Sequence, residues 1–249
     1  KKFEEIKSNR SIGLNSKLDF DFDFFLKKMN KSVVKVYEKN SPDELSRLGI
    51  KVVFGFPKFI NKNVVELNNE NIYAKKFVLA TGSKNYIPNI EGLDSVKFLD
   101  FKSFFSLKKM PKSICIVGGG IKGVELSFAL SVFGCQVALL EQNSRILYGF
   151  DRDVSDFVHE ILEKKGVKIF NDVLIKKVSH ASGKNIVEAV TDKKKVLVKS
   201  DHVFFAMGDL ACVEGLNLPA AGIRFDEGGI KINKRCRTNV KTVSYTHLR

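Results

Sequence analysis

In the middle of the chain, apolar residues occur in two patterns: short continuous runs, and a spacing of three to four residues. Short apolar runs that predict buried strands lie at residues 113–117, 136–140, 167–170 and 201–206. Between them, residues 124–133 and 151–165 carry apolar side chains at the three- and four-residue spacing of helices. This alternation of strand and helix is typical of an α/β protein with a parallel sheet, and that is the fold class we expect.

The segments on either side of this region predict further elements. Residues 173–199 contain three strand-like pieces separated by turn residues, which predicts a β-meander. Upstream, residues 24–37 predict a helix, and Ser41-Pro42 predicts the start of a second one. Four more strands are expected at residues 51–54, 64–67, 77–80 and 230–233.

Composition excludes several classes of protein. The 249 residues are 44% hydrophobic and 28% charged, which is the balance of a globular protein with one large domain or two ordinary ones. The longest apolar runs are much shorter than the roughly 18 residues of a membrane-spanning helix, so we expect no membrane partner. Residues 1–10 are charged and show no secretory signal pattern.

The charge of the chain is strongly basic, at a formal +14. Only 8 of the 42 cationic residues are arginines, and the lysines are spread along the whole sequence. Because nucleic-acid surfaces depend on clustered cations and arginine forks, we interpret this excess as compositional bias and expect no nucleic-acid partner.

Cysteine usage points to a reducing compartment, and we expect a cytoplasmic protein. The chain has four cysteines, at positions 115, 135, 212 and 236. Their wide spacing fits neither a disulfide scaffold nor a CxxC metal site, so no metal is expected.

The strongest chemical signal is a glycine pattern that follows the strand at 113–117 and opens the next helix. It contains Gly118, Gly119, Gly120 and Gly123. The first glycine of such a motif allows a tight turn, Gly120 lets the backbone approach a pyrophosphate, and Gly123 lets the helix pack on the strand. The pattern therefore predicts a dinucleotide site. A glycine-rich turn without a nucleotide is the alternative.

Glu141 ends the following strand, 18 residues after Gly123. A carboxylate in this place accepts hydrogen bonds from ribose hydroxyls and repels a 2′-phosphate, which favours NADH over NADPH. Arg145 lies near enough to affect this choice, but we interpret it as a solvated surface arginine.

Three segments together resemble a known family. They are residues 77–83 (Phe-Val-Leu-Ala-Thr-Gly-Ser), residues 116–125 (Ile-Val-Gly-Gly-Gly-Ile-Lys-Gly-Val-Glu) and residues 204–208 (Phe-Phe-Ala-Met-Gly). The chain resembles the two-dinucleotide-fold flavoproteins, and among them the class I pyridine nucleotide-disulfide oxidoreductases. That group includes dihydrolipoamide dehydrogenase and mercuric reductase, and the similarity extends over most of residues 18–240.

The resemblance implies an FAD-dependent NAD(P)H:disulfide oxidoreductase. In such enzymes a hydride passes from the nicotinamide to the flavin, and electrons then pass to a cysteine pair and a small-molecule or protein disulfide. By position, Thr81, Gly82 and Ser83 would lie by the FAD. The nicotinamide nucleotide would be held by Gly118, Gly119, Gly120, Ile121, Gly123, Glu141, Val178 and Gly208, with Ile121 gating access to the flavin.

Glu125 matches the family glutamate that pairs with a lysine near the reactive nitrogen of the flavin. It is our candidate catalytic residue, and a solvated surface glutamate is the alternative. The family's first FAD motif and its cysteine pair have no counterpart in these 249 residues. We therefore expect an internal fragment of a longer, homodimeric protein.

The resemblance divides the chain into three parts. Residues 1–110 would belong to an FAD-binding domain, 111–211 would form the NAD(P)-binding domain, and 212–249 would begin a central domain that contacts FAD. Two other functions stay open. One is a flavoprotein without a cysteine pair, such as an NADH oxidase or transhydrogenase, and the other is a non-catalytic nucleotide-binding module.

Overall fold

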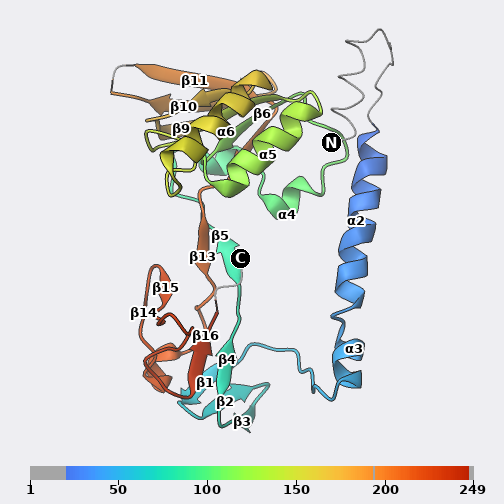
Figure 1. Ribbon diagram of the computed structural model, residues 1–249, viewed down its shortest axis with the longest axis vertical. Coiled ribbons are helices and arrows are strands. Elements are labelled where there is room, and N and C mark those ends of the chain that lie inside the picture. The colour runs from blue at the N-terminus through green and yellow to red at the C-terminus, as the bar shows by residue number, and fades with distance from the viewer. Residues whose placement is uncertain (1–20, 193, 247–249) are drawn as a thin grey trace. The chain divides into compact units, whose positions relative to one another are not determined.

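The computed structural model describes residues 21–192 and 194–246, and these form two compact units (Figure 1). Among these residues, unit 1 contains residues 21–32 and 86–208, and unit 2 contains residues 33–85 and 209–246. The segment 1–10, on which the expectation about a secretory signal falls, lies outside the described residues. None of the helices in the described ranges is long and apolar enough to cross a membrane.

Unit 1 is built on a four-stranded parallel sheet. In spatial order its strands are β12 (His202–Phe205), β6 (Ser113–Val117), β7 (Gln136–Leu140) and β8 (Lys168–Phe170). The expected α/β fold with a parallel sheet is confirmed, and each of these strands coincides with a predicted apolar run to within one residue at either end.

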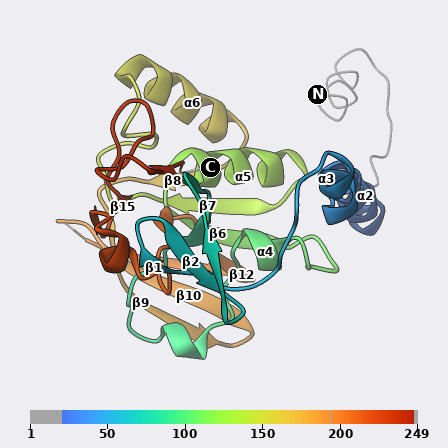
Figure 2. The same cartoon turned by 90° about the horizontal axis from the view of Figure 1, so that it is seen from below.

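Three layers make up unit 1 (Figure 2). Helices α5 (Ile121–Val132) and α6 (Arg152–Lys164) cover one face of the parallel sheet. The predicted meander covers the other face, with β9 (Leu174–Ala181), β10 (Lys184–Val190) and β11 (Lys195–Ser200) in antiparallel order.

Strand β6 shows why these runs are apolar throughout. Ile114 and Ile116 pack on the helix side, whereas Cys115 and Val117 pack on the meander side, and all four are at most 2% exposed. A strand buried on both faces has no polar alternation. Each such side chain contributes about 1.5–3 kcal/mol by leaving water, so two full cores hold the sheet in place.

The segment before β6 also packs on unit 1. It contains η2 (Leu93–Ser95) and α4 (Phe101–Phe104). The Leu99 N–H donates to Val203 O at 2.7 Å, and Lys177 forms an ion pair with Glu91 at 2.6 Å. Residues 86–110 are therefore part of the same compact unit as the parallel sheet.

Unit 2 is assembled from short strands. A three-stranded antiparallel sheet contains β1 (Lys58–Asn61), β2 (Val64–Leu67) and β3 (Glu70–Tyr73). The remaining strands pair two by two: β4 (Phe77–Leu79) with β16 (Val243–Tyr245), β5 (Ser83–Asn85) with β13 (Asp209–Ala211), and β14 (Phe225–Asp226) with β15 (Gly229–Ile230). Their core also includes η3 (Leu218–Ala221).

Both predicted upstream helices are present, as α2 (Phe22–Glu38) and α3 (Pro42–Arg47). Helix α3 begins as expected, because the hydroxyl of Ser41 accepts the Glu44 N–H and proline occupies the first turn.

Three sequence-based assignments need correction. Residues 51–54 are not a strand, and β1 starts only at Lys58, after Gly55 and Pro57 interrupt the extended run. The strand expected at 230–233 ends at Ile230. Helix α5 begins three residues earlier than predicted because Gly120 occupies its N-cap position and the helix includes Ile121 onward.

Candidate functional site

The glycine loop between β6 and α5, residues 118–120, is held closely against its neighbours. Gly118 has a φ of 110°, and a Cβ there would lie 2.5 Å from the Ala206 carbonyl oxygen. A Cβ on Gly123 would lie 1.9 Å from the carbonyl oxygen of Gly118. Both distances are too short for any side chain, so Gly118 is required where the loop passes the backbone after β12, and Gly123 is required for the first turn of α5 to pack on the end of β6.

Gly120 is different, because its missing side chain leaves open space. Its φ is −73°, which any residue adopts, and a Cβ built there would have no atom within 4 Å. The residue is also exposed at the N-terminus of a twelve-residue helix. The free N–H groups at the start of α5 and the positive end of its dipole lie next to this space. Such an arrangement binds phosphate groups.

Glu141 is buried beside this loop, at 6% exposure. Its Oε2 accepts the Gly119 N–H at 2.6 Å, and its Oε1 accepts the backbone N–H of Asn143 at 2.8 Å and the Asn143 side-chain amide at 2.6 Å. A carboxylate offers about four acceptor positions, and these contacts use three. Glu141 thus fixes the loop and retains acceptor capacity on Oε2.

Arg145 is half-buried and structural rather than the solvated surface residue we expected. Its guanidinium donates to the carbonyl oxygens of Leu147, Tyr148 and Phe150 at 2.9–3.2 Å. It also lies 5.2 Å from the centre of the Tyr148 ring. These contacts shape the turn after β7 and occupy three of the guanidinium's five donors.

The other predicted residues of this region lie on separate elements. Ile121 is 43% exposed at the first position of α5, and Glu125 is exposed one turn later on the same helix. Gly208 has a φ of 108°, and its carbonyl oxygen accepts the Tyr86 N–H at 2.9 Å. Val178 lies within β9, where its side chain is buried and its N–H donates to the Glu91 carbonyl oxygen at 2.8 Å.

Three further residues at this edge of the sheet were missed by the sequence reasoning. Asn143 holds the Glu141 carboxylate, and the Val173 N–H donates to the backbone oxygen of Glu141 at 3.1 Å. Asn171 directly follows β8, and its buried Oδ1 has no hydrogen-bond partner among the described residues. The signal that would have found them is their place just after parallel strands, where side chains of α/β sheets meet a ligand.

The predicted flavin segment lies in unit 2, between β4 and β5. Gly82 has a φ of 71°, and its carbonyl oxygen accepts the Cys212 N–H at 3.0 Å. Thr81 is exposed, and Ser83 is exposed as the first residue of β5. The segment is therefore a strand followed by a glycine turn, as expected, with polar side chains available to a ligand.

The four cysteines do not form a pair. All are free thiols, and Cys115 and Cys135 are buried. Burial raises the pKa of the Cys135 thiol to about 12 and raises that of Cys115 further. Neither supplies a thiolate near neutral pH. Within residues 21–192 and 194–246, no three metal-binding side chains come together.

Comparison with known proteins places this geometry in context. A family model described as pyridine nucleotide-disulphide oxidoreductase matches residues 2–245. The chain is 29% identical to a mercuric reductase of Bacillus cereus, over 90% of this chain and 36% of that protein. It is 33% identical to a dihydrolipoyl dehydrogenase of Bacillus subtilis (strain 168), over 78% of this chain and 42% of that protein.

Among solved structures, the chain resembles the HOCl-induced flavoprotein disulfide reductase RclA from Escherichia coli. The TM-score is 0.80 at 25% sequence identity, and the match covers 98% of this chain and 53% of that one. The chain therefore spans about a third to a half of the length of these three proteins.

Proposed function

The chain belongs to the pyridine nucleotide-disulphide oxidoreductase family, and we propose that it carries the nicotinamide-nucleotide site and part of the flavin site of an NAD(P)H-dependent disulfide oxidoreductase. In this proposal the cofactors supply hydride transfer from nicotinamide to flavin and electron transfer onward to a cysteine pair. The pair lies outside these 249 residues, whose own cysteines are unpaired.

The open space at Gly120 is the observation that carries the proposal. Gly118 and Gly123 are packed so closely that only glycine fits, whereas none of the described residues lies close enough to Gly120 to require glycine there. Glycine at this position leaves room beside the free N–H groups of α5. A ligand whose phosphates approach the backbone would use that room.

Two neighbouring side chains support NADH rather than NADPH. The buried Glu141 carboxylate stands at the end of β7, where it would accept a ribose hydroxyl and repel a 2′-phosphate. Arg145, the nearest arginine in the sequence, donates to three carbonyl oxygens of the following turn and so has few donors left for a phosphate.

The remaining assigned residues keep the roles that the family implies. Thr81, Gly82 and Ser83 would contact the FAD, Ile121 would gate the nicotinamide, and Val178 and Gly208 would line the nucleotide pocket. Glu125 would hold a lysine near the flavin, and its exposure on α5 is compatible with such a partner. A disulfide substrate, a homodimeric whole protein and a cytoplasmic location complete the proposal. The family implies a division of the chain at residues 110 and 211, with residues 86–110 packing in the compact unit of the parallel sheet.

The first test is a titration of the 249-residue chain with NADH and NADPH, monitored by calorimetry. Gly120→Ala should weaken NADH binding tenfold or more, because the methyl group fills the space meant for the pyrophosphate. Gly149→Ala is the matched control, since that glycine also has nothing within 4 Å of an added Cβ. Equal affinity of all three proteins would overturn the assignment of the site.

A second test addresses cofactor choice and the substrate. Glu141→Gln should reduce the preference for NADH over NADPH, because it removes the charge that repels a 2′-phosphate. In the full-length protein, NADH oxidation that requires a disulfide substrate would support the reductase. Oxidation of NADH with oxygen alone would instead favour the flavoprotein without a cysteine pair.

A further inference from the structure

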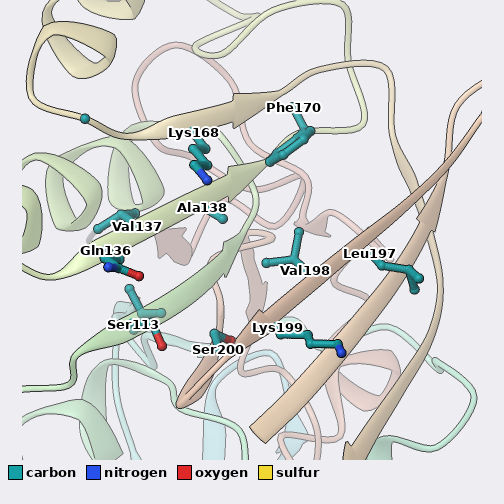
Figure 3. A pocket seen from close by; sticks show the side chains of 12 residues that line it. Ser113, Gln136, Val137, Ala138, Lys168, Phe170, Leu197, Val198, Lys199 and Ser200 are labelled. Carbon is teal, nitrogen blue, oxygen red and sulfur yellow. The ribbon is translucent and has the colours of Figure 1, made fainter.

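Unit 1 contains a hollow at the edge of the sheet opposite the glycine loop. The hollow has a volume of about 400 Å³ and lies between the parallel sheet and β11 of the meander (Figure 3). Ser113, Gln136 and Lys168 line it, and these are the first residues of β6, β7 and β8. It therefore opens at the amino ends of the parallel strands, whereas the glycine loop lies at their carboxyl ends.

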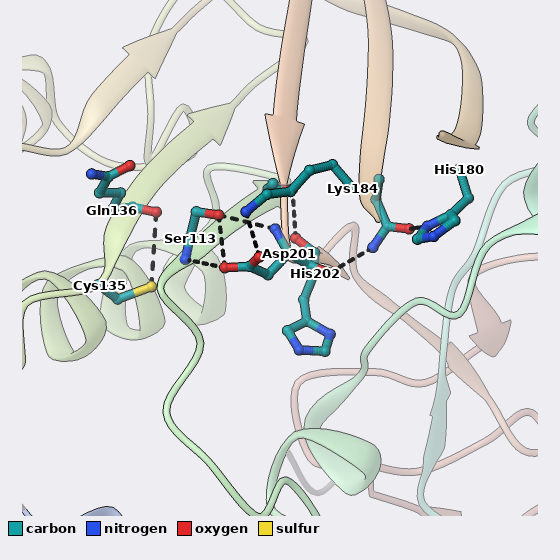
Figure 4. A network of polar contacts seen from close by, with 9 residues as sticks. Ser113, Cys135, Gln136, His180, Lys184, Asp201 and His202 are labelled. Atoms are coloured by element: carbon teal, nitrogen blue, oxygen red, sulfur yellow. Dashed lines mark hydrogen bonds and ion pairs between the residues drawn. The ribbon is translucent and has the colours of Figure 1, made fainter. Parts of the chain in front are cut away.

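The hollow exists because the side chains that face the meander are small at this end. Ser113, Ala138 and Ser200 alternate in register with Cys115, Leu140 and Val198, which pack in the meander-side core. Where bulky residues meet, the two sheets close over a dry core, and where small ones meet, a gap remains. The hydroxyls are satisfied, because Ser113 binds Asp201 (Figure 4) and Ser200 donates to the His202 carbonyl oxygen.

The lining combines an apolar wall with cationic groups. Phe170 and Val198 face the hollow from opposite sheets, and the Lys168 side chain lies at its rim, whereas Lys199 lies on the outer face of β11 (Figure 3). No acidic residue lines it. The nearby Asp201 carboxylate is bound by Lys184 at 2.5 Å and by Ser113 (Figure 4). The ammonium group of Lys168 has no ion-pair or hydrogen-bond partner in the described part of the chain, although its backbone pairs with β7.

We propose that this hollow is a second ligand site of unit 1, and that it takes a small molecule with a flat apolar body and one anionic group. The flat body would lie between Phe170 and Val198, over Ala138. The anion would meet the ammonium group of Lys168 and the side-chain amide of Gln136 at the mouth. The volume lies within the range of small-molecule sites, and a few polar groups around an apolar wall are their usual composition.

The experiment is a titration of the whole 249-residue chain with 2-naphthoate, followed by calorimetry. We expect one site with a dissociation constant on the order of 1 mM or tighter, given the usual binding energy per atom of small ligands. The neutral 2-naphthamide should bind at least fivefold more weakly, and excess NADH should not displace 2-naphthoate.

Two variants and one control locate the site. Lys168→Gln should weaken 2-naphthoate about fivefold, and Ala138→Leu should abolish binding by filling the hollow. Lys176→Gln, an exposed lysine on β9, should change nothing. Circular dichroism establishes that Ala138→Leu is folded, and Lys168→Gln tests the proposal independently of it.

Several results would overturn the proposal. They are absence of saturable binding, displacement by NADH, equal affinity for the amide, or equal affinity of Lys168→Gln and the unmodified chain. None of these would affect the nucleotide site, because that site is tested by Gly120→Ala. If the chain did not bind NADH, the titration with 2-naphthoate would still test the hollow, because the two sites lie at opposite ends of the parallel strands.

Discussion

Units 1 and 2 bury their apolar residues in different ways. Unit 1 has a core on each face of its parallel sheet, and the residues proposed to bind a nicotinamide nucleotide are anchored to that sheet. Unit 2 has one core beneath short strands, while Phe54, Phe56 and Val78 are at least 72% exposed. Unit 1 also exposes single apolar side chains, such as Phe157 at 65%, so the difference lies in the cores: unit 1 packs both faces of one sheet, whereas unit 2 joins several small sheets over one core.

The largest effect on stability is expected when one buried phenylalanine is removed from each unit. Phe204→Ala in unit 1 and Phe59→Ala in unit 2 should each cost about 3–5 kcal/mol, because each side chain is at most 1% exposed. Calorimetry should show that each variant lowers a different thermal transition. NADH binding should be lost only in Phe204→Ala, and its loss in Phe59→Ala would mean that the units are not separate.

A smaller cost is expected from Gly123→Ala. The added methyl meets a backbone oxygen at 1.9 Å and cannot move aside, so the variant should lose about 3 kcal/mol, the upper end for an overpacked site. Urea unfolding followed by circular dichroism measures this loss. Gly120→Ala should unfold at the same urea concentration as the unmodified chain, and an equal loss in both would refute the distinction between packing and binding glycines.

Glu141→Gln should destabilise unit 1 by about 1–3 kcal/mol. Three N–H groups converge on the carboxylate, and an amide that replaces it turns an NH₂ group toward at least one of them. The free energy of unfolding of unit 1 measures the effect. Asn143→Ala, which removes one of these donors, should cost less, and the reverse order would mean that Glu141 does not organise the loop.

The pH dependence of unit 1 should show a modest loss of stability in acid. The hydrogen bond from Lys184 and those from Ser113 lower the pKa of Asp201, so its contribution is present above the unfolded pKa and is lost as pH falls. Burial lowers the pKa of His202, which acts in the same direction as pH falls below about 6.5. Asp201→Asn should flatten the acid limb of a stability–pH curve, and the exposed Asp94→Asn should not.

The smallest effect is expected at the exposed aromatic residues of unit 2. Phe56 is 97% exposed, so Phe56→Ser should change the free energy of unfolding by less than about 0.5 kcal/mol. The concentration dependence of light scattering should nevertheless fall, because less apolar surface is left to associate. A large loss of stability would show that Phe56 is buried in the chain in solution.

The sequence predicts the two units unequally. Strands β6 and β7 are buried on both faces, so their apolar runs set their bounds without reference to the rest of the chain. In unit 2, residues 51–54 have the same apolar character but no partner strand. Strand β3 has only two apolar or aromatic residues, Ile72 and Tyr73, and it forms because the turn at Asn68 and Asn69 pairs it with β2. Whether such short segments form strands depends on the strands available to pair with them more than on their local sequence pattern.

The candidate site shows the same division. Spacing alone identifies the glycine loop and Glu141, because each follows a strand whose bounds the pattern gives. Spacing does not show that Gly118 and Gly123 pack while Gly120 faces open space, since this depends on the carbonyl oxygens of Ala206 and Gly118. The role of Arg145 was equally inaccessible, because its partners are backbone oxygens and carry no residue type.

The insertion of residues 86–208 of unit 1 between the two segments of unit 2 has a consequence for the order of folding. Strand β4 pairs with β16, and Asn217 donates to the Phe59 carbonyl oxygen 158 positions earlier. During synthesis, residues 86–208 emerge completely before the second half of unit 2 exists. Residues 86–208 can therefore fold early from contacts within their own segment. Strand β4 stays unpaired until β16 has been synthesised, and its free edge is open to aggregation during that time.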